Sequence, residues 1–99
     1  MASSERKRKE YKLCVVTWVD ILSTSGWEKA KDVECPELDA VGWVIHQDRK
    51  TIKIASTLDR EDTLGESKDE ALPIPYGISA FPKGCVRNIK FIAESALIL

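Results

Sequence analysis

Cysteine and histidine are the residue types that most often build metal centres and nucleophilic sites, and this chain has few of them. Its three cysteines are Cys14, Cys35 and Cys85, and His46 is the single histidine. No two cysteines form a C-x-x-C pair, whereas structural zinc ligands usually come in close pairs. No sequence neighbour makes His46 a base, and a reactive thiol needs a cationic environment. We therefore expect no metal, no cofactor and no catalytic group, in a protein that is not an enzyme.

Two tryptophans, a carboxylate and a hydroxyl in the first third of the chain are better suited to binding a ligand. Trp18 and Trp27 can stack on a nucleobase, a contact worth about 1–3 kcal/mol per base. Asp20 or Ser25 can read the polar edges of the same ligand. A structural role stays open for each: tryptophans also cover cores, Asp20 can accept N–H groups of the next turn, and Ser25 can cap a helix.

Two basic residues beside a glycine near the end of the chain can hold a phosphate group. Lys83 precedes Gly84, whose turn offers backbone N–H groups, and Arg87 follows three residues later. The alternative is that both side chains are solvated on a surface of mixed charge. The full set of candidate ligand-binding residues is Trp18, Asp20, Ser25, Trp27, Lys83 and Arg87.

The composition is that of one ordinary globular domain. The chain has 99 residues, 43% of them hydrophobic and 31% charged, with a net charge of −1; this length allows one compact core. Proteins that bind nucleic acid over their surface usually carry a net positive charge, so nucleic acid is not the expected partner. No apolar run approaches the roughly 18 residues of a membrane span, and no export signal is visible. Free thiols without an export signal predict a cytoplasmic protein.

Alternating apolar residues predict five β-strands. A polar turn at 47–50 separates two alternating runs, which indicates a hairpin. Gly42 inside a strand indicates a bulge or a close approach of two backbones. Both faces of the first strand are mostly apolar, as in a strand covered on both sides. The strands are expected over residues 11–22, 40–47, 51–58, 76–81 and 86–92.

The segments between these strands differ in character. Residues 1–9 predict a disordered basic tail, because they are polar and charged. A short helix is expected from Trp27 to about Glu34, in the first connection, and Pro36 should end it. Residues 59–73 predict a flexible acidic loop. Residues 94–99 form an apolar tail that can pack on the domain, 10–93, or on another subunit.

The turn Pro82-Lys83-Gly84 suggests how the strands are arranged. Proline suits the start of a helical turn and glycine permits a sharp exit, so one 3-10 turn is expected before the last strand. Such a turn prevents a simple hairpin and sends the fifth strand to the far edge of the sheet. The sequence therefore predicts a mainly β fold, a five-stranded small barrel of Sm-like or Src-homology-like type. Its strand edges and apolar tail predict a homo-oligomer.

The order of the tryptophan and turn motifs resembles a family of small, uncharacterised bacteriophage proteins. The matching segments span about residues 12–92: Thr17-Trp18-Val19-Asp20, Ser25-Gly26-Trp27, Val41-Gly42-Trp43-Val44 and Phe81-Pro82-Lys83-Gly84. The resemblance implies a phage origin, and an infected bacterial host as the location. Small Sm-like phage proteins include anti-defence sponges that bind nucleotide signals of host immunity, an analogy at the level of fold.

Three functions follow as hypotheses. The first is a non-enzymatic phage accessory protein that sequesters a small anionic ligand, a nucleotide immune signal of the host. The alternative is an interaction module that binds a host or phage protein through a barrel edge and the acidic loop at 59–70. The third, binding of single-stranded nucleic acid, is common for such barrels, but the charge balance argues against it.

Overall fold

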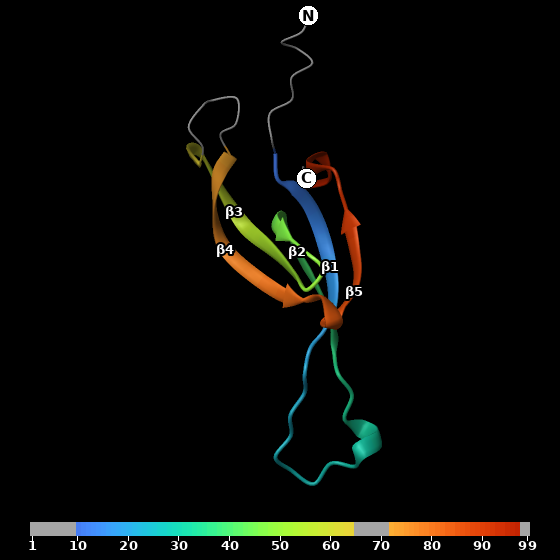
Figure 1. Ribbon diagram of the computed structural model, residues 1–99. Coiled ribbons are helices and arrows are strands. Elements are labelled where there is room, and N and C mark those ends of the chain that lie inside the picture. The colour runs from blue at the N-terminus through green and yellow to red at the C-terminus, as the bar shows by residue number, and fades with distance from the viewer. Residues whose placement is uncertain (1–9, 65–71, 98–99) are drawn as a thin grey trace, which may run out of the picture.

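The computed structural model describes residues 10–64 and 72–97, which form one antiparallel sheet (Figure 1). Its five strands lie in the order β4-β3-β2-β1-β5, so the mainly β class and the number of strands are confirmed. Three short 3-10 turns, η1 to η3, complete the fold. The bounds are β1 Lys12–Val19, η1 Ala30–Asp32, β2 Glu37–Gln47, β3 Thr51–Leu64, β4 Leu72–Pro82, η2 Lys83–Cys85, β5 Val86–Phe91 and η3 Glu94–Leu97.

The Pro-Lys-Gly turn redirects the chain as expected. Residues Lys83–Cys85 form η2, and β5 then pairs with β1 at the edge opposite β4. The backbone N–H of Lys83 donates to the carbonyl of Lys50 at 2.7 Å, which ties η2 to the turn between β2 and β3. The expected closure into a barrel is not found, because within the described residues β4 and β5 form no ladder with each other. The sheet is curved but open, with β4 and β5 at its edges.

The helix expected in the first connection is not formed. Between Trp27 and Glu34 the chain makes only the single 3-10 turn η1, whose N-cap is Lys29 with no side-chain cap bond, so Ser25 does not cap it. The reason is a lack of support: short helices in water depend on packing of one face, and no residue of η1 is buried. We call residues 21–35 the arm.

The acidic segment expected as a loop over 59–73 belongs largely to strands. β3 continues to Leu64 and β4 starts at Leu72, with Asp59 opposite Ile74 and an irregularity before the next pair. Asp59 Oδ1 accepts the N–H groups of Glu61 and Asp62 at 3.0 and 3.2 Å. These bonds accommodate residues 60–62 of β3, which have no paired residue in β4. The rest of that segment, 65–71, lies outside the described residues, as do the predicted tail 1–9 and the last two residues of 94–99.

The core lies on the inner face of the curved sheet. The first strand was expected to be covered on both sides, and the structure covers one face more fully: Cys14 and Val16 are fully buried there, with Trp18 packed beside them. On the other face Leu13 is buried, whereas Val15 and Thr17 are half-buried. Gly42 is a close approach, as expected: a Cβ at this position would lie 2.7 Å from the carbonyl oxygen of Ala55. The core cluster is Cys14, Val16, Ile52, Ile54 and Phe81, with Trp18, Ala40, Val44, Val86 and Ile89 packed against it.

Candidate ligand pocket

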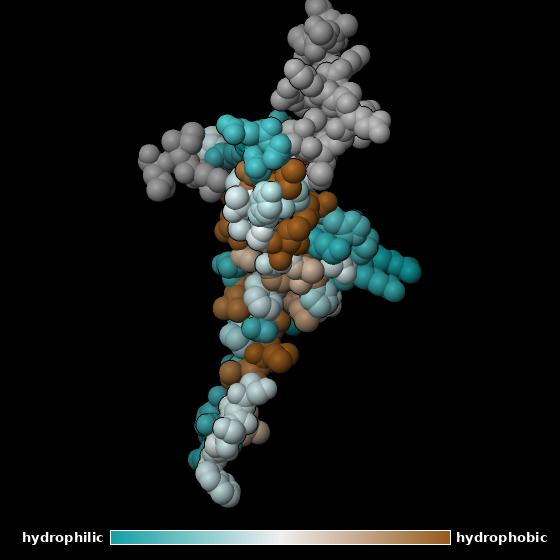
Figure 2. All heavy atoms as spheres, turned by 90° about the vertical axis from the view of Figure 1, so that its left-hand side faces the viewer, coloured by the Kyte–Doolittle hydropathy of each residue, from teal (hydrophilic) through white to brown (hydrophobic). Residues whose placement is uncertain are grey.

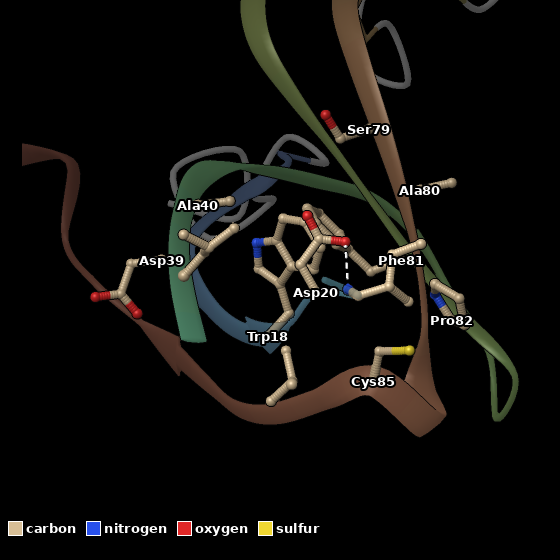
Figure 3. A pocket seen from close by; sticks show the side chains of 12 residues that line it. Trp18, Asp20, Asp39, Ala40, Ser79, Ala80, Phe81, Pro82 and Cys85 are labelled. Carbon is tan, nitrogen blue, oxygen red and sulfur yellow. Dashed lines mark hydrogen bonds between the residues drawn. The ribbon is translucent and has the colours of Figure 1, made fainter. Parts of the chain in front are cut away.

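A cavity of about 710 Å³ opens where β1 ends, between the start of β2 and the end of β4 (Figure 3). Small-molecule sites have volumes of roughly 300–1,000 Å³, so this one has room for a ligand. Most of its wall is apolar, with a few polar side chains. The lining residues are Trp18, Val19, Asp20, Ile21, Leu38, Asp39, Ala40, Ser79, Ala80, Phe81, Pro82 and Cys85.

Trp18 is the central side chain of this pocket. It is the last inward-facing residue of β1, so it lies half on the core and half in the cavity. Its ring centroid lies 5.1 Å from that of Phe81, with the planes tilted by 54°. Tilted aromatic pairs at this distance are favourable, so Phe81 helps to fix the indole in one orientation. The pocket therefore has a rigid aromatic wall.

Asp20 brings a carboxylate to the mouth of the pocket. Its Oδ1 accepts the N–H of Ile21 at 2.8 Å, which is the structural role that the sequence left open. Its own N–H donates to the carbonyl of Pro36 at 2.9 Å and closes the base of the arm. Asp20 and Trp18 both line the pocket (Figure 3). Among the described residues only Oδ1 has a hydrogen-bond partner, which leaves Oδ2 for a ligand.

The other polar side chains of the lining point away from Trp18 or lie at the side of the pocket. Asp39 Oδ1 accepts the hydroxyl of Thr17 at 2.6 Å, and its carboxylate points away from Trp18 in Figure 3. The hydroxyl of Ser79 also points away, at the far rim. The thiol of Cys85 lies at the side formed by η2, near Pro82.

The structure brings together two of the six predicted ligand-binding residues, Trp18 and Asp20. Ser25 and Trp27 lie on the arm, and Trp27 is 103% exposed. Lys83, in η2, is half-buried and Arg87, in β5, is exposed; neither lines the pocket. Lys83 does fall between two lining residues, Pro82 and Cys85.

Sequence reasoning missed the wall formed by β2 and β4. Phe81 and Ala40 face the cavity from strands that are distant in sequence from Trp18. The available signal was the position of Phe81 directly before the proline turn, which fixes where β4 meets the end of β1. No sequence pattern reports the curvature that brings Ala40 to the same space.

His46 belongs to a turn rather than to the pocket. Its Nε2 lies 3.0 Å from Oδ2 of Asp48, whose Oδ1 accepts the N–H groups of Lys50 and Thr51 at 2.8 Å each. The His46 contact and these N–H donors lower the pKa of Asp48 to about 2. The arrangement stabilises the predicted turn between β2 and β3.

Metal sites, membrane-spanning helices and similarity to known proteins are three further sources of a functional assignment, and none of them supplies one for the described residues. Within residues 10–64 and 72–97, no three His, Cys, Asp or Glu side chains are grouped to hold a metal ion. The described part of the chain has no helix of the length and hydrophobicity that crossing a membrane requires. Comparison with protein-family models, with curated proteins and with solved structures found no match. The resemblance to small phage proteins therefore stays a prediction.

Proposed function

We propose that this protein is a non-enzymatic, phage-encoded binder that sequesters a small nucleotide, a signal of host immunity. The observation that carries the proposal is the pocket that the indole of Trp18 and the carboxylate of Asp20 both line. Flat aromatic ligands bind more tightly against an indole, because stacking of a base on an aromatic side chain contributes about 1–3 kcal/mol to binding. The mostly apolar lining favours a planar group inside the cavity.

The carboxylate of Asp20 determines which part of a nucleotide enters. An ionised carboxylate accepts hydrogen bonds, so Oδ2 suits a base amino or imino group or a ribose hydroxyl. It repels phosphate, because like charges brought together are costly. The base or ribose therefore lies inside, and the phosphate lies outside the mouth.

The phosphate then lies toward η2 in this proposal. Lys83 is placed between the lining residues Pro82 and Cys85, and Arg87 follows in β5. Cationic side chains at this position add charge-assisted hydrogen bonds to phosphate oxygens. In this proposal Lys83 and Arg87 keep the phosphate-binding role predicted for them, outside the cavity that neither of them lines.

Calorimetric titration with a panel of cyclic dinucleotides, mononucleotides and NAD-derived nucleotides tests the proposal. Asp20→Asn keeps the acceptor for the N–H of Ile21 but removes the charge, and we expect it to weaken binding about 10-fold or more, as for other charged hydrogen bonds. Glu61→Gln, on the exposed part of β3, is the matched control and should bind like the wild type. No heat with any nucleotide, or equal affinity of Asp20→Asn and wild type, contradicts the proposal.

The open edge of β4 favours a second candidate, binding of a host or phage protein by strand addition. Prolines 73 and 75 offer no N–H group, so the usable part of β4 is its second half. Ile78 lies there and is 53% exposed. Under this candidate, Ile78→Lys abolishes capture of a protein partner and leaves nucleotide titrations unchanged; undiminished capture rules the edge out.

A further inference from the structure

The two open edges of the sheet differ in charge. β4, at one edge, has no acidic or basic residue between Leu72 and Pro82, and Figure 2, which views the molecule from the side of β4, shows hydrophobic residues at the surface of the sheet. β5, at the other edge, carries Arg87 and Lys90, and both side chains are exposed. The neighbouring strand β1 adds Lys12. Neither β1 nor β5 contains an acidic residue, so this side of the sheet is positively charged.

The carboxylates closest to this edge lie outside the two strands. Glu10, Asp20 and Glu94 are placed beyond the ends of β1 and β5 along the chain. Glu94 is already paired, because Nη2 of Arg60, on β3, donates to its Oε1 at 3.0 Å. Asp39 belongs to β2, which β1 separates from β5. The positive charge of the β5 edge is therefore not cancelled by acids of the strands that form it.

The backbone of β5 is oriented to pair on its open side. The N–H of Ile92 donates to the carbonyl of Leu13 at 3.0 Å, so the backbone groups of Ile92 point toward β1. Because this orientation alternates along an antiparallel strand, the N–H and C=O groups of Ile89 and Phe91 point to the open side. Within the described residues β5 pairs with β1 alone. Each of these two residues therefore offers one donor and one acceptor to another strand.

The side chains of β5 determine which residues suit the two faces of an added strand. Phe91 lies opposite Cys14, on the inner face of the sheet, and is 53% exposed. Lys90 lies opposite Val15, on the outer face. Side chains alternate between the faces of a strand, so an added strand places every second residue beside Phe91 and the others beside Lys90. An apolar residue suits the first position and an acidic residue suits the second.

Other occupants match this edge less well. Two β5 strands that pair about Lys90 bring this residue opposite its equivalent, and like charges directly opposite each other are destabilising. The β4 strand of a second copy has no acid for Lys90, and its Pro73 and Pro75 offer no N–H group. The phosphates of nucleic acid only accept hydrogen bonds, so they leave the carbonyls of Ile89 and Phe91 unpaired. The net charge of −1 also disfavours nucleic acid.

We propose that the β5 edge binds an extended acidic segment of another protein by antiparallel strand addition. The backbone groups of Ile89 and Phe91 pair with the segment, which supplies affinity. Lys90 faces its carboxylates, which selects the partner by charge. A lysine on an edge strand also discourages pairing with uncharged or basic strands. The site lies apart from the β4 edge and from the pocket, so the proposal does not depend on nucleotide binding.

Fluorescence anisotropy with the full chain and a labelled peptide of seven alternating valine and glutamate residues tests the proposal. We expect saturable binding that weakens as salt is added, since the charges are exposed. Lys90→Glu should bind the peptide at least about 10-fold more weakly, because it turns an attraction into a repulsion. Lys53→Glu is the matched control: Lys53 is an exposed lysine of β3, which β2 and β1 separate from β5. No saturable binding, or equal affinities of Lys90→Glu and Lys53→Glu, contradicts the proposal.

Methylation of the peptide backbone tests strand addition itself. In antiparallel pairing, the peptide residues opposite Ile89 and Phe91 exchange hydrogen bonds with them and share the inner face, so these residues are the valines. We expect N-methylation of the valines to abolish binding and N-methylation of the glutamates to be tolerated. Equal effects of the two modifications, or a loss of binding with methylated glutamates alone, contradict antiparallel addition at β5.

Two further measurements separate this edge from the pocket and from other occupants. Asp20→Asn should bind the peptide like the wild type and Lys90→Glu should bind nucleotide like the wild type, because Asp20 lines the pocket and Lys90 does not. A single-stranded oligonucleotide that displaces the peptide at the same concentration as unlabelled peptide would assign the edge to nucleic acid. A wild-type dimer in sedimentation velocity that the peptide dissociates would assign it to a second copy. Either result overturns the proposal.

Discussion

Gly42 lies where β2 approaches β3, and adding one methyl group there tests the sheet geometry that forms the pocket. In Gly42→Ala the new Cβ would lie 2.7 Å from the carbonyl oxygen of Ala55 and 3.1 Å from Cβ of Ile54. Neither neighbour can turn away as a flexible side chain would, because one is backbone and the other is branched and buried. The two strands must separate, at the point where Trp43 pairs with Ala55.

The expected loss follows from that overlap. Overpacking by a methylene group in a filled core costs about 1–3 kcal/mol. For a domain of this size, each kcal/mol corresponds to a shift of about 4–8 °C in Tm. We expect Gly42→Ala to lower the urea midpoint with an unchanged slope, since the surface exposed on unfolding is the same.

Gly84→Ala is the matched control for this substitution. Nothing lies within 4 Å of a Cβ at Gly84, and its φ is not positive, so alanine fits without strain. Reduced freedom of the unfolded chain should then stabilise the protein by about 0.4–1 kcal/mol. Equal midpoints for Gly42→Ala and Gly84→Ala would refute the close approach of β2 and β3 at Gly42.

Three further predictions concern the core, the thiols and the hairpin turn. Ile52→Ala should lower the free energy of unfolding by about 2–5 kcal/mol in urea denaturation, because Ile52 is fully buried; a loss below that range would mean that the inner face repacks. A chromogenic disulfide should label exposed Cys35 at once and buried Cys14, whose pKa is raised by burial, only on unfolding; equal rates would contradict the burial. The pKa of Asp48 is lowered to about 2, so its charge stabilises the fold above about pH 4 and this contribution is lost as pH falls toward 2. Denaturation between about pH 5 and 2 should therefore show the advantage of wild type over Asp48→Asn shrinking; a constant or growing advantage would contradict the assignment.

The parts of the fold that local chemistry decides were predictable from the sequence. The run of β-branched and aromatic residues predicted a strand over 11–22, and β1 forms within it, at Lys12–Val19. The polar run at 47–50 predicted a turn, where Asp48 now accepts two backbone N–H groups. The Pro-Lys-Gly turn predicted that β5 would leave β4 and join the far edge.

Features that depend on tertiary support were not predictable in the same way. The helix expected from Trp27 onward had good local signals, but nothing packs against it. The acidic composition after Leu58 predicts a loop, but pairing with β4 extends β3 to Leu64. Barrel closure would have required a hydrogen-bonded ladder between the edge strands β4 and β5. No local sequence pattern indicates how far apart two such strands lie.

The candidate site also combines residues that local sequence predicts with residues that only the tertiary structure brings together. Trp18 and Asp20 could be chosen because they share one face at the end of a strand. Phe81, which sets the orientation of Trp18, comes from a strand more than sixty residues later. The positions of Ser25 and Trp27 depend on how far the arm extends, which composition does not reveal.

Native mass spectrometry of the protein purified from bacteria that make cyclic-nucleotide or NAD-derived signals tests the central claim most directly. The account predicts an added mass of nucleotide size that is retained by the wild-type chain and by Glu61→Gln and lost from Asp20→Asn. The same spectra report the number of subunits. A wild-type chain without added mass, from cells shown to contain the signals, would contradict sequestration of a nucleotide.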